Sequence, residues 1–329
     1  MRRREFLKLA GASLIAAPAV SRAATQPLRV VVAANRFHEA DGLMAAMCNQ
    51  MAHNSNLSAP YNVDWPRWPR VQSNPPAPTK DSGIPRCLVD VFKTASDAAP
   101  TATMEIWCID DLAITSGDSG KKVTAMEQIK HYTKPSEPDG VIAFGTAGYP
   151  GLLSTDGCAT IGGTIFIHDA SNGAPGSWSW PGYMDKLLPS KTPASFFSNV
   201  SADQKTLLAI TSEMIAPQNH PAGVLQLIIA ADAVGVSSVN EPPPYCDADT
   251  NSIVLAQQAG ATNITSVETT HGVIRSMWDK PFIFVTAIPN RVCHFPDEAQ
   301  NIYAQEFPSS HNAGVALKHV IPYFVSAIA

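Results

Sequence analysis

Short apolar runs, separated by polar stretches, recur along the whole chain and predict the strands of a buried sheet. The clearest are LRVVVAA at 28–34 and PFIFVTAI at 281–288, because both are continuous and rich in β-branched or aromatic residues. A strand that is buried on both faces has this continuous character, whereas a strand with one wet face alternates. Further runs of the same kind lie at 103–109, 140–145, 160–168, 225–230, 234–239 and 264–268.

Between these runs, apolar residues recur at the spacing of a helix. The stretch 311–328 is the clearest case, because its apolar residues return every three or four positions. Strands that alternate with helices are typical of the α/β class. We therefore expect one α/β domain, with a central mixed, mostly parallel sheet flanked by helices. The other predicted helices lie at 38–51, 121–131, 202–215, 251–259 and 272–278.

Two long stretches show neither the apolar runs of strands nor the apolar spacing of helices. They lie at about 55–100 and 172–200, and both contain clusters of proline, glycine, serine and tryptophan. Such composition is typical of loops that run over the surface. We expect two loop insertions in a domain that occupies 25–329.

The first 24 residues have the organisation of an export signal. RREFLK at 3–8 matches the R-R-x-F-L-K pattern of a twin-arginine signal, and an apolar stretch at 9–20 and small residues at 21–24 follow it. The apolar stretch is shorter than the roughly 20 residues of a membrane-spanning helix. We expect the twin-arginine translocase to export the chain, and residues 1–24 to be removed. The result is a periplasmic or secreted protein with no membrane attachment; the alternative is an uncleaved amphipathic helix.

The composition predicts a well-buried core. Hydrophobic residues make up 45% of the chain and charged residues 16%, with a formal net charge of −5. This charge gives no electrostatic case for binding nucleic acid or an anionic membrane surface.

Neither a metal site nor a cofactor is expected. The chain has no C-x-x-C pair or Cys/His cluster with zinc spacing, and no G-x-S-x-G, H-E-x-x-H, P-loop or G-x-G-x-x-G pattern. In an oxidising compartment one to three disulfides are expected, with a buried thiol as the alternative for each cysteine. The six cysteines are Cys48, Cys87, Cys108, Cys158, Cys246 and Cys293.

Candidate chemistry follows the ends of four predicted strands. Polar residues occur at Asn35–Glu39, at Thr146–Gly148, at Glu268 and at Asn290. Ligands of open α/β sheets lie at the carboxyl ends of the strands, so these positions are candidates for one site. Each of them alone is equally typical of a turn or a helix cap.

Taken in order, these segments resemble the nucleoside phosphorylase/nucleosidase superfamily. FGTAGYPG at 144–151 and GCATIGGTIFIHDA at 157–170 look like its G-[ST]-A-G-G loop and the strand with His-Asp that follows. SVETTHGVIRSMWDKPFIFVTAIPNRV at 266–292 is similar to its V-E-M-E-x-x-A helix, its late strand and the S-D or T-N pair that ends that strand. The resemblance covers most of the mature chain.

The resemblance implies roles for five residues. Glu268 corresponds to the second glutamate of V-E-M-E and would bind the sugar hydroxyls by charge-assisted hydrogen bonds. Asn290 falls where the superfamily has an Asp or Asn that bonds the purine near N7; an Asn donates a hydrogen bond but delivers no proton. The backbone at Thr146, Ala147 and Gly148 would line the base and phosphate region.

The resemblance leaves the acceptor open between water and inorganic phosphate. Arg36 lies in the loop after the first strand, where part of the superfamily holds phosphate, but the G-x-P-x-R pattern around it is absent. Arg275 and Arg291 are the other candidates, and each is also typical of a surface cation.

Two histidine–carboxylate pairs are further candidates for acid–base chemistry or substrate binding. They are His38 with Glu39 and His168 with Asp169. The alternative for each is a structural histidine.

Three hypotheses follow. The first is an enzyme that cleaves the N-glycosidic bond of a purine nucleoside or a similar N-glycoside, by phosphorolysis or hydrolysis. The second is a non-catalytic periplasmic protein that binds a nucleoside or another small molecule on the same fold. The third is an enzyme on this fold with an unrelated substrate. The resemblance also implies a homo-oligomer.

The export hypothesis makes a direct prediction. Replacing Arg3 and Arg4 together by Lys keeps the charge but removes the guanidinium pair, so mature protein should no longer reach the periplasm. Fractionation of cells that express the wild type and the double variant measures this. Unchanged periplasmic protein from the variant would rule out the twin-arginine route.

Overall fold

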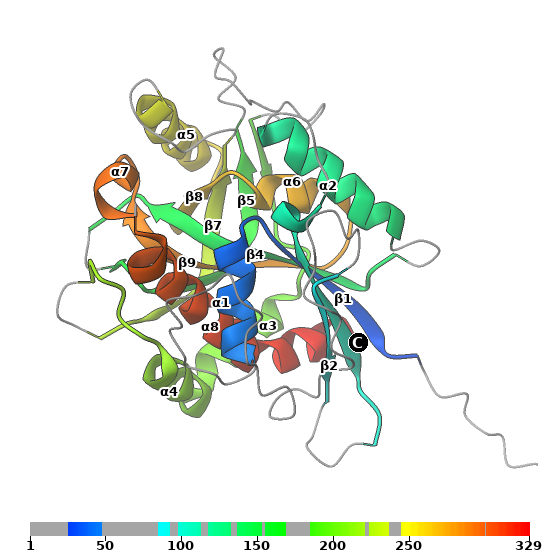
Figure 1. Cartoon of the computed structure of the whole chain (residues 1–329). Coiled ribbons are helices and arrows are strands. Elements are labelled where there is room, and N and C mark those ends of the chain that lie inside the picture. Colours follow the sequence, from blue (N-terminus) through cyan, green and yellow to red (C-terminus); the bar gives the residue numbers. More distant parts are fainter. Residues whose placement is uncertain are drawn as a thin grey trace, which may run out of the picture.

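The structure, a computed structural model, describes most of the chain and shows one α/β domain (Figure 1). The export signal predicted at 1–24, together with Cys48 and Asp169, lies outside the described residues. The described ranges are 26–47, 85–92, 98–112, 118–132, 137–152, 155–168, 185–220, 224–236, 245–299 and 301–329.

The elements alternate along the chain as the sequence predicts. The strands are β1 (Leu28–Ala34), β2 (Cys87–Val91), β3 (Ala102–Cys108), β4 (Gly140–Tyr149), β5 (Ala159–Ile167), β6 (Lys186–Leu188), β7 (Leu227–Gly235), β8 (Ile264–Glu268) and β9 (Phe282–Arg291). The helices are α1 (Phe37–Met47), α2 (Asp118–Tyr132), α3 (Ala194–Ala202), α4 (Gln204–Glu213), α5 (Tyr245–Gln258), α6 (His271–Met277), α7 (Phe295–Glu298) and α8 (Phe307–Ile328). A 3-10 turn at Ile109–Asp111 and a π-helical turn at Ile302–Glu306 complete them.

The nine strands form one mixed sheet that closes on itself. Its order is β2-β3-β1-β4-β8-β7-β5-β6, and β9 pairs with both β4 and β5. Strands β4, β9, β5, β7 and β8 therefore form a closed, barrel-like ring, from which β1, β3 and β2 extend beyond β4. The predicted mixed α/β sheet is confirmed, but the closure was not predicted, because it depends on which distant strands pair.

Parts of the two predicted loop insertions are regular structure, so the prediction is wrong there. Within 55–100, β2 pairs antiparallel with β3 as an edge strand. Within 172–200, β6 pairs with β5, and α3 begins at Ala194. These elements are short, with four buried residues in β2, one in β6 and two in α3, which is too few to give a visible period. Of the remaining residues of both stretches, the structure describes 85–86, 92, 98–100, 185 and 189–193, and the others lie outside the described ones.

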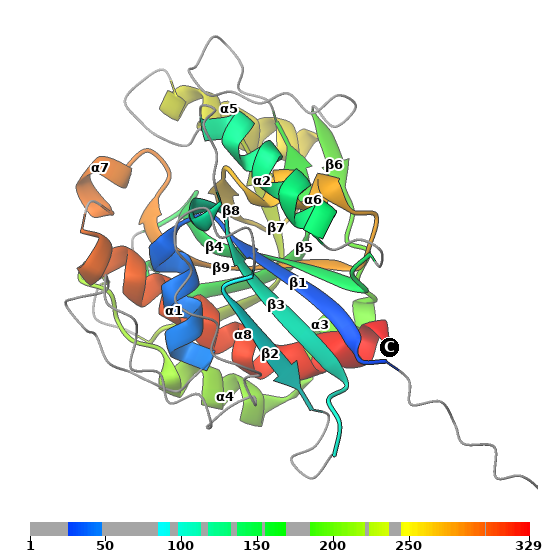
Figure 2. The same ribbon diagram turned by 45° about the vertical axis from the view of Figure 1, so that its right-hand side comes forward.

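The described core contains three hydrophobic clusters, and the two larger ones lie on opposite faces of β1. In β1, Val30 and Val32 face a cluster that includes α1, α3, α4 and α8, whereas Val31 and Ala33 face a cluster with α2 and α6. Figure 2 shows these two groups of helices on opposite sides of the strands. Burial on both faces explains the continuous apolar run of this strand.

Helices α1 and α8 pack backbone against backbone. A Cβ atom added at Gly42 would lie 2.6 Å from the Cβ of Ser310, and one at Gly314 would lie 2.7 Å from the Cβ of Ala46. Glycine at both positions therefore permits the close approach. The contact fixes the first turn of α1 relative to the start of α8, and both lie near the candidate site described below.

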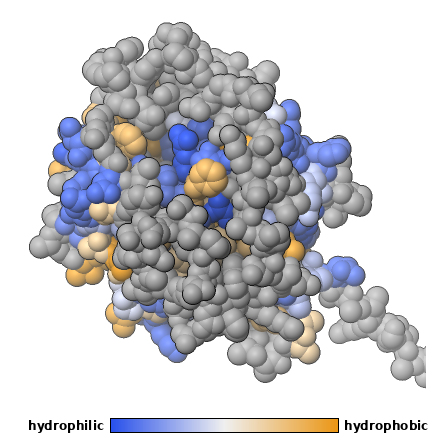
Figure 3. All heavy atoms as spheres, in the orientation of Figure 1, coloured by the Kyte–Doolittle hydropathy of each residue, from blue (hydrophilic) through white to orange (hydrophobic). Residues whose placement is uncertain are grey.

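The described surface carries scattered hydrophobic residues. The face in Figure 3 shows hydrophilic and hydrophobic side chains interspersed among the coloured atoms. Among the described residues, no helix is both long and apolar enough to cross a membrane. The large hydrophobic side chains that remain exposed are Phe37, Tyr132, Leu152, Leu208, Val224 and Val254.

The contact between α1 and α8 predicts whether a substitution at Gly314 stabilises or destabilises the protein. Gly314→Ala should destabilise the protein by about 1–3 kcal/mol, because the added methyl group forces the helices apart. Helix propensity alone predicts the opposite, a gain of up to about 1 kcal/mol. Urea unfolding measures the difference, and Ser326→Ala on the exposed face of α8 is the control. Ala46→Gly in the Gly314→Ala background should recover part of the loss; a stabilised Gly314→Ala protein would contradict this account.

Candidate functional site

Strand pairing brings three of the predicted site positions to one place. Gly148 near the end of β4 pairs with Asn290 of β9 on one side and with Val267 of β8 on the other. Glu268 follows Val267 directly. The candidates that lie far apart in sequence therefore meet where these strands end.

The same edge continues to His168. Gly235, the last residue of β7, pairs with Glu268, and the backbone N–H of His168 donates to the carbonyl of Gly235 at 2.8 Å. His168 thus lies two strands away from Glu268. Its Nδ1 contacts Asp185 Oδ1 at 2.5 Å, so the partner of His168 in the described structure is Asp185. The predicted partner Asp169 lies outside the described residues.

Glu39 is a buried carboxylate that ties two of the candidate segments together. Its Oε2 accepts hydrogen bonds from the backbone N–H groups of Asn35 and Arg36, both at 2.9 Å. Its Oε1 accepts from the backbone N–H and the hydroxyl of Thr146, both at 2.9 Å. A carboxylate offers about four lone-pair sites. All four are filled, so Glu39 positions the loop after β1 against β4.

The sequence predicts a pair of His38 with Glu39, but in the structure each of these side chains makes its hydrogen bonds to other groups. His38 Nε2 contacts Glu306 Oε2 at 2.7 Å. Burial lowers the pKa of His38, but the hydrogen bond and the charge of Glu306 raise it by more. The pKa of His38 therefore lies above its usual value. The signal for Glu39 was local: it is the third residue of α1 and accepts from the backbone N–H just before the helix, as in a capping box.

Glu268 has one occupied and one unoccupied carboxylate oxygen. Its Oε2 accepts from the backbone N–H groups of Thr270 and His271, the latter at 2.5 Å, at the start of α6. Its Oε1 is buried and has no hydrogen-bond partner, and the nearest titratable nitrogen is Nδ1 of His271 at 3.9 Å. Glu268 is therefore a helix cap that retains one free acceptor oxygen.

Asn290 is buried in β9 beside Gly148. One hydrogen of its Nδ2 donates to the carbonyl of Arg291 at 2.7 Å, so the second amide hydrogen can serve a ligand. A Cβ at Gly148 would lie 3.6 Å from this Nδ2 and 3.3 Å from Val292. Glycine keeps the space next to the Asn290 amide clear. Thr146 is partly exposed and Ala147 is buried.

Two of the three candidate phosphate-binding arginines are engaged by the protein. Arg291 is bound to Glu298 through Nε at 2.8 Å and Nη2 at 2.6 Å. Arg275 is buried, donates to the Trp278 carbonyl at 3.3 Å and lies over the Phe282 ring. Arg36 is different.

The Arg36 side chain is 50% exposed and its Nη1 is 3.8 Å from Asp110 Oδ1. A long, exposed ion pair of this kind contributes little and is easily broken. Of the three, Arg36 is the arginine whose guanidinium could reach an anion.

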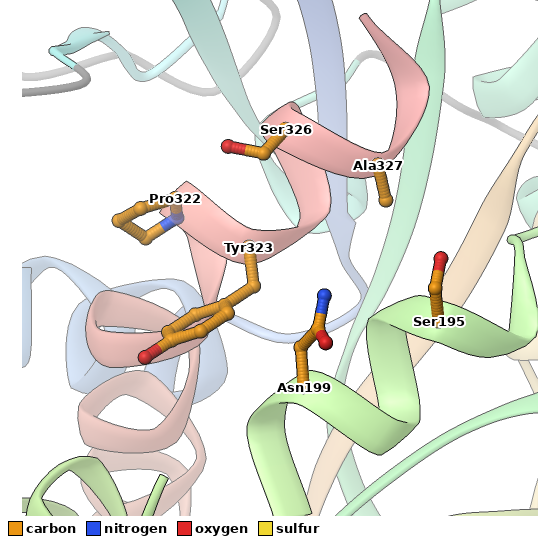
Figure 4. A pocket seen from close by; sticks show the side chains of 6 residues that line it. All are labelled: Ser195, Asn199, Pro322, Tyr323, Ser326 and Ala327. Carbon is orange, nitrogen blue, oxygen red and sulfur yellow. The ribbon is translucent and has the colours of Figure 1, made fainter. Parts of the chain in front are cut away.

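A surface hollow lies at the far end of β4. Gly140, the first residue of β4, packs against Phe324 and Ile328 at the end of α8, whereas the candidate residues follow Gly145 at the other end. Figure 4 shows the neutral side chains of α3 and α8 around the hollow, which offer no charged group to a phosphate. The lining residues are Ser195, Asn199, Pro322, Tyr323, Ser326 and Ala327.

Within the described ranges, no three His, Cys, Asp or Glu side chains gather as metal ligands. Cys87, Cys108 and Cys158 are buried thiols. The prediction of one to three disulfides among the six cysteines stays a prediction.

Comparison with known proteins finds likeness only among solved structures. No family model and no curated protein matches the chain. A 5′-methylthioadenosine/S-adenosylhomocysteine nucleosidase from Colwellia psychrerythraea 34H, in complex with adenine, is similar with a TM-score of 0.50 and 9% identity, over 91% of this chain and 96% of that one. The nucleosidase of the same name from Helicobacter pylori gives 0.50 and 8%, over 89% and 97%. At this identity the likeness shows the fold alone, and the chain shares its fold with these two nucleosidases.

Proposed function

We propose that this protein hydrolyses the N-glycosidic bond of a purine nucleoside or a closely similar N-glycoside. The observation that carries the proposal is Oε1 of Glu268, which is buried and has no hydrogen-bond partner. Glu268 follows Val267, which pairs with Gly148, and Gly148 pairs with Asn290 on its other side. The similar solved nucleosidases support the same chemistry, one of them in complex with adenine.

Glu268 is suited to hold the sugar. Its Oε2 is fixed by two backbone N–H groups of α6, which sets the direction of Oε1. A fixed carboxylate oxygen accepts hydroxyl hydrogens strongly, because the acceptor is charged. The negative charge also stabilises the positive charge that the ring develops as the glycosidic bond breaks.

Asn290 is suited to hold the departing base. Its spare amide hydrogen can donate to a ring nitrogen such as purine N7, which takes up charge as the bond breaks. An Asn cannot deliver a proton, so this donor stabilises the leaving base without protonating it. Glu39 holds Thr146 and the loop after β1, and acts as a positioning residue.

The state of the arginines favours water over phosphate as the acceptor. Arg275 and Arg291 are engaged in internal contacts, so among these three candidates Arg36 is the one left to bind an anion. A phosphorylase needs its phosphate held firmly, usually by bidentate arginine contacts. Hydrolysis requires no such site.

A second candidate function, nucleoside binding without cleavage, is favoured because the site has Asn290 in place of an acid. Because Asn290 stands where an acid would supply a proton, the same site suits a periplasmic protein that binds nucleosides without cleaving them. A free carboxylate oxygen and an amide donor suffice for binding.

The sugar contact predicts a selective loss of affinity. Glu268→Gln should bind a nucleoside such as 5′-methylthioadenosine about ten- to a hundredfold more weakly, because a charge-assisted bond contributes about 1.5–3 kcal/mol. Binding of free adenine should stay unchanged, since adenine has no sugar hydroxyl. Calorimetric titration of both ligands measures this. Glu213→Gln, which weakens a partly buried ion pair with Lys318 and His319, is the control. Equal losses for adenine and nucleoside would refute the role of Glu268.

The base contact predicts an effect on rate. Asn290→Ala should lower turnover about a hundredfold with a smaller change in KM, because the lost hydrogen bond acts mainly in the transition state. Asn290→Asp should shift preference toward nucleosides whose base leaves after protonation at N7. The measurement is release of free base from a panel of purine nucleosides, with and without phosphate. A wild type that binds nucleosides but never releases base would leave the binding function standing and the hydrolase proposal refuted.

A further inference from the structure

The π-helical turn Ile302–Glu306 contains Gln305, whose buried side-chain amide contacts the residue before Asn290. Nε2 of Gln305 donates to the carbonyl of Pro289, the residue before Asn290, and lies 3.4 Å from Oδ2 of Asp156. Oε1 of Gln305 accepts from the backbone N–H of Asn219 at 2.9 Å. Both amide hydrogens and the amide oxygen thus have partners, which fixes the orientation of the carboxamide.

The side chain of Asp156, which lies beside Gln305, is mainly uncharged at neutral pH. Burial raises the pKa of Asp156 to about 8, the charge of Glu298 adds to this, and Arg291 opposes it. At pH 7 the side chain of Asp156 is therefore an uncharged acid. The other titratable groups beside it are Cys158 and His220, whose Nδ1 contacts the backbone carbonyl of Asp156 at 2.5 Å.

The neighbouring residue anchors the turn on its other side. Glu306 contacts His38 at 2.7 Å, and His38 precedes Glu39 in the first turn of α1. Two consecutive residues thus connect the turn to the two segments that carry Asn290 and Glu39. A short π-helical segment is a rare feature and occurs often at functional sites.

We propose that Gln305 is a positioning residue, which sets the direction of the Asn290 side chain by holding the carbonyl of Pro289. The peptide between Pro289 and Asn290 carries the Cα of Asn290, so a rotation of this peptide turns the carboxamide away from its ligand. The link to catalysis rests on the proposed function, whereas the link to the Asn290 backbone does not.

The experiment uses a near-isosteric variant, Gln305→Met, in the full-length mature protein. A hydrogen bond to a carbonyl polarises the following N–H, so the backbone amide signal of Asn290 reports the Gln305 contact directly. This signal is recorded by NMR on protein labelled with 15N-asparagine and assigned with Asn290→Asp. Turnover and KM for base release are measured in parallel.

Asn312→Ala is the matched control. Asn312 is a buried amide of α8 that bonds to Gly157 and Ile215 at 2.8 Å and makes no hydrogen bond to the carbonyl of Pro289. Its loss should lower stability but leave the Asn290 signal in place.

We expect the Asn290 signal to move in Gln305→Met and not in Asn312→Ala, and turnover to fall about ten- to a hundredfold with KM changed much less. Gln305→Asn keeps an amide that is one methylene too short to reach Pro289, and should behave like Gln305→Met. An unmoved signal in either folded Gln305 variant overturns the proposal, as does an equal movement in Asn312→Ala. If neither Gln305 variant folds, Gln305 is structural and the proposal is also overturned. A wild type without any base release removes the proposed function, while the NMR result still decides the role of Gln305.

Discussion

The double pairing of β9 is the constraint on which the rest of the structure depends. This strand runs parallel to β4 along one edge and antiparallel to β5 along the other, and so closes the ring. Strands β4 and β8 run in opposite directions, and in an extended sheet their carboxyl ends would lie at opposite edges. Here they overlap only at Gly148 and Val267, so both carboxyl ends meet beside Asn290. Closure of the sheet, and not proximity in sequence, therefore assembles the site.

Two buried carboxylates near this meeting point differ in how completely the protein satisfies them. Glu39 accepts four hydrogen bonds from its own chain and has no lone pair left for a ligand. Glu268 accepts two bonds on one oxygen and none on the other. An unsatisfied buried polar atom costs about 1–3 kcal/mol, which a folded protein tolerates where a ligand supplies the missing partner. Glu39, whose oxygens all accept hydrogen bonds from the protein, is therefore suited to position other residues. Glu268, with one oxygen unpaired, is suited to bind a ligand.

The sequence predicts those parts of the fold that local pattern encodes. The bounds expected for the strands at 28–34 and 264–268 agree with β1 and β8. For β1 the reason is that an apolar run buried on both faces has clear ends. The helix expected at 202–215 corresponds to α4, which begins after Asp203, whose side chain caps it, whereas Ala202 is the last residue of the separate helix α3. Strand β2 was missed because it is a five-residue strand beside a proline-rich stretch, and with four of its residues buried it shows no alternation.

Of the candidate site, the sequence indicates the residues at strand ends but not their partners. Glu268 and Asn290 were found because each follows an apolar run, and pairing with Gly148 and Val267 brings them together. The pairing of His168 with Asp185 depends on contacts between segments that no local pattern reveals. Gln305 and Asp156 were not recognised for the same reason, since neither follows a strand and their common contact joins residues 149 positions apart.

The end of β9 illustrates how a site of this kind obtains its rigidity. Pro289 is held through its carbonyl by Gln305, and Arg291 is held through its backbone N–H and its guanidinium by Glu298 of α7. Asn290 lies between them and bonds to the carbonyl of Arg291. A donor that stabilises charge in a transition state must be in place before the reaction, because reorganisation would consume the stabilisation. Since the two flanking residues are fixed by separate elements, the amide of Asn290 keeps its direction without help from a ligand.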